Sequence, residues 1–420
     1  MTDGGVAPTP RPPLPLLGEG ETRLQSDALL LVTLCLASSL AVINALALAP
    51  FLAEIAPEIG TTVALLGQAV TATSLVGAAF ALTMGPGADW AGYRMLLLAG
   101  IGAMIAGSLG TAIAPSYALL IGAQVIGGLS GAAITPMAFA IAGQRFTGEQ
   151  RRTAIARMYA AAAGAGVVGF PLLTFIGERA GWRWSFVALG LAATLGLALA
   201  WVVIPRDRAE RTAPFRLRTM LHSYRPILRH RSTALLYGGQ FLRGVCWVGT
   251  LAYAGAFFVE ELGRSLQEAG LIWVVVGPGF LIGSLLVSAR LRLLDQRLTF
   301  AVSVALMGLT IGGVFVWQPS FLIAYALLFV AALFGGVAEV TTVTILAAES
   351  PAQQGTTMAL NSAIIRLGSA GGGAIGGTLL ATGGYASLGV GFPLVAFGAA
   401  LCGWLSRRRS PTCARDAVRE

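Results

Sequence analysis

Three charged side chains lie inside long apolar segments of the chain: Arg243, Glu339 and Arg366. A charge at the centre of a bilayer costs about 3 kcal/mol on insertion scales, so such a residue usually has a partner or a function. Gln240 and Trp247 share a helical face with Arg243 because they lie three and four positions away from it. This face is suited to bind an organic solute, including an anionic one. Alternatively, Arg243 contacts backbone carbonyls between helices.

Glu339 and Arg366 admit two interpretations, because they are expected at similar depth on neighbouring helices. Either they form a structural ion pair, or Glu339 carries a coupling proton with Arg366 beside it. We also expect Arg243 and Glu339 to be the charged pair that functions at the solute site. In the first half of the chain, Asn44 and Gln124 are amides in apolar segments. They either contact the solute or form hydrogen bonds between helices. The four cysteines show no metal-binding or disulfide spacing, and we expect neither a metal nor a cofactor.

The surrounding composition indicates a lipid environment. Of the 420 residues, 56% are hydrophobic and 11% are charged, whereas soluble proteins carry about a quarter charged residues. A helix needs about 20 apolar residues to cross the hydrocarbon core. The apolar runs are too long, and alternate too little, for strands of a barrel. The expected spans are 28–49, 62–83, 95–113, 118–141, 154–176, 184–204, 234–258, 269–288, 299–317, 320–346, 356–380 and 386–405.

These runs predict an all-α membrane protein with twelve transmembrane helices in two pseudo-symmetric bundles of six. The N-terminal tail is 1–27, the first bundle 28–204 and the second bundle 233–405, followed by a tail at 406–420. The linker, 205–232, is rich in arginine. It forms either a basic amphipathic helix on the membrane surface or a solvated connection.

Arginine sets the expected orientation, because cytoplasmic loops are enriched in positive charge. Eight arginines lie between Arg206 and Arg231, whereas the alternate loops carry mainly glutamate. Both termini are therefore expected in the cytoplasm, in an inner-membrane protein. The charges behind the net +9 lie mainly in the loops and tails, without a basic face interleaved with aromatic residues, so we expect no nucleic-acid partner.

The two halves repeat at an offset of 203 residues. Gly181 and Trp182 correspond to Gly384 and Tyr385, at the start of the last helix in each half. Thr147, followed three residues later by a glutamine, predicts a capping box before the fifth span, and its counterpart precedes the eleventh. Parallel repeats of six spans are one known transporter plan, with the solute site between them.

Residues 85–94, between the second and third spans, read GPGADWAGYR. This segment resembles the signature loop of the major facilitator superfamily, and the matching functional positions are Gly85, Asp89, Gly92 and Arg94. The stretches that begin at Gly169 and Ser350 are similar to those of sugar- and drug-efflux members, including drug:proton antiporters. The resemblance covers nearly the whole chain after residue 27.

Several positions depart from the pattern of the multidrug members. Gln124 stands where efflux members often carry arginine, and Asn44 is the only deep amide of a helix that often holds an acid in proton antiporters. Phe170 separates Gly169 from Pro171, which are adjacent in the antiporter motif. These departures weaken the multidrug interpretation more than the transporter interpretation.

The resemblance implies a monomeric secondary transporter in which two bundles rock about a central solute site. Asp89 would contact the N-terminus of the eleventh span, so Gly85, Asp89, Gly92 and Arg94 are expected to control the conformational change. We expect efflux of a small organic solute coupled to protons. Import or facilitated passage is the alternative within this class, and a membrane sensor or scaffold without transport is the alternative outside it. No enzyme motif is present in the sequence, and we expect no enzymatic activity.

Overall fold

A computed structural model describes most of the chain outside its two tails and central linker. The described residues are 17–206, 224, 227–290, 295–317, 320–349 and 354–407, without the side chains of 17–26, 82–90, 289–290, 349 and 354–355. Within these residues the chain forms helices and connecting turns, with no strand. The predicted basic helix of the linker lies largely outside the described residues.

The first half forms six long helices and three short ones. They are α1 (Leu17–Leu46), η1 (Ala49–Phe51), α2 (Leu52–Glu58), α3 (Val63–Leu66), α4 (Gln68–Ala91), α5 (Tyr93–Ala112), α6 (Tyr117–Arg145), α7 (Gly148–Ala180) and α8 (Trp182–Val203). The second half contains α10 (Arg231–Glu260), α11 (Leu266–Gly270), α12 (Ile272–Arg290), α13 (Gln296–Val316), α14 (Phe321–Glu349) and α15 (Gln354–Arg407).

Eleven helical segments of the described chain are long and apolar enough to cross a membrane, and the last of them, 356–407, is 52 residues long. That segment contains two spans, because the backbone leaves the helical conformation at Gly383 and Gly384. The all-α membrane fold with twelve transmembrane helices in two bundles of six is thus confirmed.

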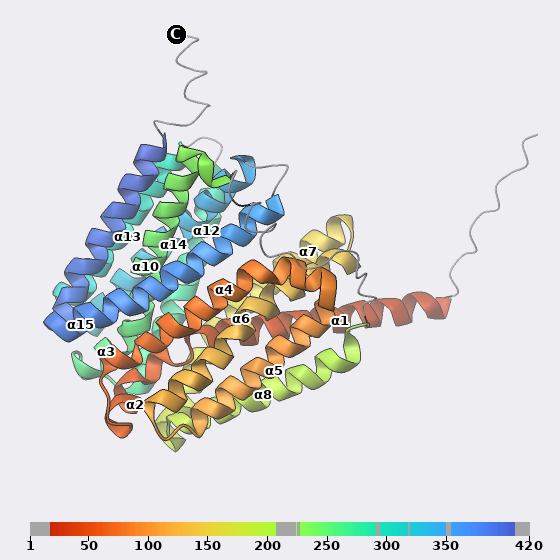
Figure 1. Cartoon of the computed structure of the whole chain (residues 1–420), viewed down its shortest axis with the longest axis horizontal. Helices are drawn as coiled ribbons and strands as arrows, with labels where there is room; N and C mark the ends of the chain where they lie inside the picture. Colours follow the sequence, from red (N-terminus) through yellow and green to blue (C-terminus); the bar gives the residue numbers. More distant parts are fainter. Residues whose placement is uncertain are drawn as a thin grey trace, which may run out of the picture.

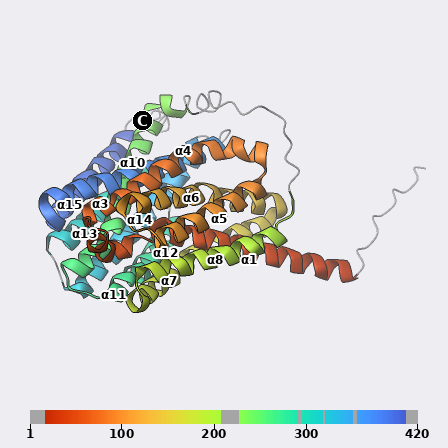
Figure 2. The same ribbon diagram turned by 60° about the horizontal axis from the view of Figure 1, so that its bottom comes forward.

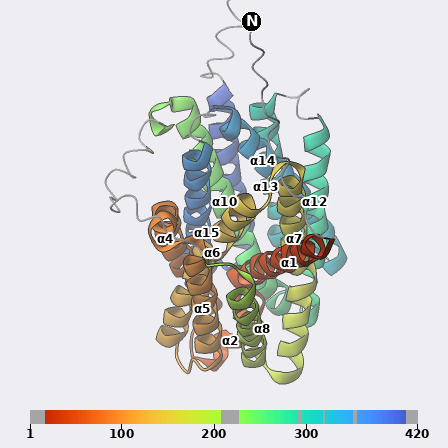
Figure 3. The ribbon, with the colours of Figure 1, turned by 90° about the vertical axis from the view of Figure 1, so that its right-hand side faces the viewer.

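The two bundles are inclined to one another (Figure 1). They meet near α2 and α3 and diverge toward the ends that carry the chain termini. Figure 2 shows α1 projecting beyond the other helices on that side, and Figure 3 shows α10, α13 and α14 rising above α5 and α8. The halves are joined where α4 packs on α15, α7 packs on α11 and α12, and η1 and α2 pack on α10.

Small residues permit the closest helix contacts. A Cβ atom built on Gly283 of α12 would lie 1.9 Å from the carbonyl oxygen of Leu333 on α14. One built on Gly372 of α15 would lie 2.7 Å from the carbonyl oxygen of Val245 on α10. Without an apolar driving force between helices in lipid, such close backbone packing provides much of the association energy.

The predicted repeat is present at the connection that precedes the last helix of each half. Gly181 and Gly384 both have positive φ angles, of 93° and 64°, which glycine adopts without strain. The next residue then anchors its helix: the Trp182 indole donates to Glu58, and the Tyr385 hydroxyl donates to Glu260 Oε2 at 2.7 Å. The two turns thus share backbone geometry and an aromatic–carboxylate hydrogen bond.

The predicted capping box at Thr147 is wrong. Thr147 occupies the N-cap position of α7, but its side chain makes no capping hydrogen bond. Its counterpart, Ser350, lies outside the described residues. A complete capping box occurs instead at α11, between Ser265 and Glu268.

Candidate solute and coupling site

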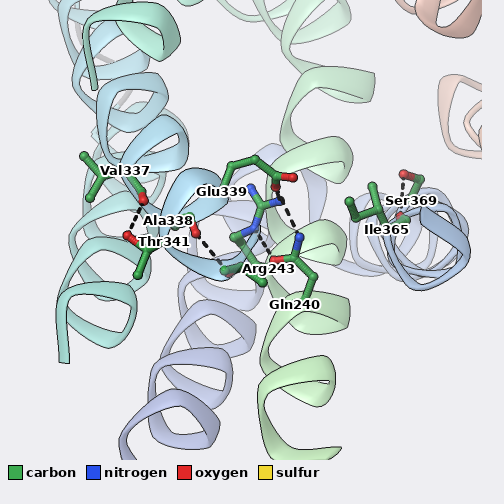
Figure 4. A network of polar contacts seen from close by, with 9 residues as sticks. Gln240, Arg243, Val337, Ala338, Glu339, Thr341, Ile365 and Ser369 are labelled. Carbon is green, nitrogen blue, oxygen red and sulfur yellow. Dashed lines mark hydrogen bonds and ion pairs between the residues drawn. The ribbon is translucent and has the colours of Figure 1, made fainter. Parts of the chain in front are cut away.

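A polar network joins α10 to α14 within the second bundle (Figure 4). Arg243 forms an ion pair with Glu339, and its Nε atom donates to Gln240 Oε1 at 2.9 Å. Gln240 Nε2 in turn donates to Glu339 Oε2 at 3.2 Å. Each of the three side chains therefore contacts the other two, and the ionised network is electrically neutral.

The helix period explains how the sequence builds this network. Gln240 and Arg243 are three positions apart, so both face α14. Trp247 lies on the same face one turn later, where a Cβ atom on Gly335 of α14 would be 3.9 Å from its ring. The predicted shared face of Gln240, Arg243 and Trp247 is present.

The two charges of the network differ in accessibility. The Arg243 side chain is 4% exposed, whereas that of Glu339 is 24% exposed. Removing two charges from water costs several kcal/mol per ion, and their attraction offsets this only when the remaining polar atoms are also bonded. Gln240 supplies those extra bonds to both partners.

Glu339 forms its ion pair with Arg243, the partner expected at the solute site, and the alternative structural pair with Arg366 is not formed. Glu339 is bonded to Arg243 and Gln240, while Arg366 projects from α15 to the other bundle. Its Nη2 atom donates to the carbonyl oxygen of Gly131 on α6. The periodicity of α15 fixes the face of Arg366, but the identity of the helix opposite that face depends on how the bundles are packed.

The structure shows hydrogen bonds between helices for both amides of the first half. Asn44 Nδ2 donates to Ser130 Oγ at 3.0 Å, and Gln124 Nε2 donates to Thr111 Oγ1 at 3.0 Å. This is the second of the two interpretations offered for them. A contact of either amide with solute stays a prediction.

A family model described as Major Facilitator Superfamily matches residues 34–292 and 236–418. The chain belongs to the Major Facilitator Superfamily.

Solved structures from this superfamily share the fold at low sequence identity. A D-xylose–proton symporter is 15% identical with a TM-score of 0.71, and 90% of this chain aligns with 97% of that one. A point mutant of the nucleoside transporter NupG is 11% identical with a TM-score of 0.73, covering 90% of this chain and 99% of that one. A bacterial homolog of the human lysosomal transporter Spinster is 17% identical with a TM-score of 0.70, and 92% of this chain aligns with 99% of that one.

A curated sequence relative is the transcription regulatory protein OpdE of Pseudomonas aeruginosa. It is 25% identical over 251 residues, which are 59% of this chain. The match spans 60% of the length of that relative.

The signature loop of the superfamily lies where α4 meets α5. Gly85 and Asp89 are in the last turns of α4, and the Asp89 side chain lies outside the described residues, so the contact expected for Asp89 stays a prediction. Gly92 has a φ of 84° and forms the turn between the helices. Arg94 Nη2 donates to the carbonyl oxygen of Trp201 at 2.6 Å, and its guanidinium lies 5.3 Å from the centre of that indole ring. Arg94 therefore ties the start of α5 to the end of α8.

Gly77 on α4 flanks the Arg366 guanidinium, and no sequence pattern marks it as part of the site. A Cβ atom there would lie 2.9 Å from Arg366 Nη1. The chain has 55 glycines, and a glycine that accommodates a distant side chain looks like any other in sequence.

Proposed function

We propose that this superfamily member is a secondary active transporter that exports a small organic solute across the inner membrane by alternating access, driven by the proton gradient. In this proposal both termini lie in the cytoplasm, on the side toward which the bundles diverge. The observation that carries the proposal is the Gln240–Arg243–Glu339 network, a buried ion pair with a partly exposed acid inside a transporter fold.

The network suits proton coupling because its charge depends on a single accessible carboxylate. With Glu339 ionised, the pair is neutral and all three side chains are bonded. A proton on Glu339 would leave Arg243 as a single charge, 4% exposed, without its counter-ion. Such a charge is strongly destabilising, so protonation would favour another arrangement of α10 and α14. This two-state element links proton binding to conformation.

The test compares metabolites of a deletion strain and its parent, inside the cells and in the medium. Export predicts that the solute accumulates in deletion cells and falls in the medium, and the reverse pattern would indicate import. The identified solute is then measured in vesicles containing the purified protein. Absence of flux in those vesicles would favour the sensor alternative over transport.

Proton coupling is tested in the same vesicles with Glu339→Gln. This variant should lose transport driven by a pH gradient while solute exchange continues. Glu268→Gln is the matched control, because Glu268 is 38% exposed in α11, away from the network. Normal gradient-driven transport in Glu339→Gln would remove the coupling role from Glu339.

A further inference from the structure

The Arg366 guanidinium is surrounded by residues of both bundles. It extends from α15 to the Gly131 carbonyl of α6, and α4 borders it at Gly77. A Cβ atom at Gly77 would lie 2.9 Å from Nη1, and one at Gly131 would lie 3.3 Å from both terminal nitrogens. Glycine at these two positions therefore makes room for the guanidinium.

Arg366 lies at the depth of the membrane interior. The eleventh span begins at Thr356, ten positions earlier, which is about 15 Å at 1.5 Å per residue. That is half of a hydrocarbon core about 30 Å thick. One turn further along α15, the Ala370 carbonyl accepts a hydrogen bond from Thr71 Oγ1 of α4 at 3.0 Å, where the bundles touch.

The positive charge of Arg366 has no counter-ion among the described residues. Its one hydrogen bond there goes to a neutral carbonyl, although a guanidinium has five N–H donors. Glu339, the acid expected beside it, is held by Arg243. Of the three interior charges found in the sequence, those of Arg243 and Glu339 neutralise each other, and that of Arg366 is left without a counter-ion among the described residues. A cation at this depth costs about 3 kcal/mol, and a single carbonyl offsets only part of that.

We propose that Arg366 binds an oxyanion group of the transported solute, so that the solute is an organic anion carrying a carboxylate or a phosphate. This inference rests on the proposed transport function and assigns solute recognition to Arg366 instead of the proton-coupling role expected from sequence. The guanidinium fork matches both oxyanions through paired hydrogen bonds. Arg243 does not fill this role, because its charge is already neutralised within the network.

The location supports the same conclusion. Parallel-repeat transporters hold their solute near the midplane, between the two halves. An anion on Arg366 would adjoin α4 and α6 of one bundle and α15 of the other. Its binding energy would therefore depend on the relative orientation of the bundles, as alternating access requires.

The test measures thermal unfolding of the purified full-length protein in a buffer free of phosphate and carboxylate. The probes are benzoate, succinate and glycerol 3-phosphate, each compared with its uncharged counterpart: benzamide, succinamide and glycerol. At least one organic anion should raise the Tm, and its counterpart should not. Inorganic phosphate is a separate arm, and a shift with that ion alone would overturn the assignment to an organic solute.

Variants of Arg366 locate the site. Arg366→Gln should weaken binding of the stabilising anion at least tenfold. Arg366→Lys keeps the charge but loses the fork, so it should bind with intermediate affinity. The control is Arg264→Gln, an arginine 37% exposed beside Glu268, which should bind as the wild type does.

Three results would overturn the inference: equal shifts in wild type and Arg366→Gln, equal shifts from the uncharged counterparts, or no shift with any anion of the panel. If Arg366→Gln does not fold, wild-type affinity in Arg366→Lys would overturn it. Undiminished transport of an uncharged solute by Arg366→Gln vesicles would overturn this inference and leave the proposed function intact. Lack of flux of the identified solute in wild-type vesicles would overturn the proposed function itself.

Discussion

Removing the charge of Glu339 should destabilise the protein more than removing the charge of Arg243, although both changes break the same ion pair. The asymmetry follows from exposure. Glu339→Gln leaves a guanidinium that is 4% exposed, whereas Arg243→Met leaves a carboxylate that is 24% exposed and open to hydration. Gln240 stays beside the remaining charge in either case.

The expected magnitudes follow from the two remaining charges. Leaving a buried charge uncompensated costs about 3–5 kcal/mol, which is the expectation for Glu339→Gln. Arg243→Met leaves the Glu339 carboxylate without its ion pair but hydrated and bonded to Gln240. A loss of this kind costs about 1–2 kcal/mol. The double variant removes both charges, so its stability should be close to that of the wild type. The losses of the single variants should therefore be far from additive.

Denaturant unfolding in detergent, followed with a thiol-reactive dye, provides the measurement. Cys246 is fully buried one turn from Arg243, so in a background in which Cys35, Cys402 and Cys413 are replaced by serine its labelling reports opening of this helix pair. The Arg264–Glu268 pair, with N···O at 3.8 Å and both side chains over a third exposed, is the control. Its coupling energy should not exceed about 0.5 kcal/mol. The reasoning would be refuted if the stability losses of the two single variants added up in the double variant, or if Arg243→Met lost more stability than Glu339→Gln.

Three further predictions concern packing and gating. Gly283→Ala should cost about 1–3 kcal/mol of stability, because the new methyl group would overlap the Leu333 carbonyl, whereas Gly102→Ala, with open space around it, should have little effect on unfolding. Tyr385→Phe removes the hydrogen bond to the α10 carboxylate and should lower stability by about 1 kcal/mol; an unchanged unfolding midpoint would show that this bond contributes nothing. Asp89→Asn should slow transport while equilibrium solute affinity stays within a few-fold, and complete loss of binding in folded protein would contradict a gating role.

The twelve spans were predictable because lipid leaves one simple rule: a run of apolar residues long enough to cross must form a helix. The turn at Gly384 was predictable as well, since its partner Gly181 occurs at the same point of the other half. The capping box at Thr147 failed because the capping pattern does not by itself fix the side-chain rotamer that makes the bond. The local sequence therefore predicted the positions of the helices better than the hydrogen bonds that cap them.

The candidate site was predictable only within one helix. The spacing of Gln240 and Arg243 places them on one face whatever that face contacts. The choice of partner for Glu339 was different, because the sequence offered Arg243 and Arg366 on two different helices of the same half. Only the rotation of α14 and α15 about their axes decides between them, and the apolar surroundings of both helices carry little information on that rotation.

The distribution of ion pairs bears on how the bundles move. Among the described residues, a local pair, Arg264–Glu268, lies within one segment at α11. The other four join helices, two pairs within the first bundle and two within the second: Arg145–Asp27, Arg183–Glu58, Arg243–Glu339 and Arg407–Asp295. These pairs join helices of the same bundle and do not oppose rocking of one bundle on the other. Arg366 differs, because its acceptor at Gly131 belongs to the opposite bundle. Rocking that moves α15 away from α6 would deprive the guanidinium of this carbonyl, and an anion travelling with Arg366 would replace the lost acceptor. A bound anionic solute would thereby lower the free-energy cost of the same movement that carries it across the membrane.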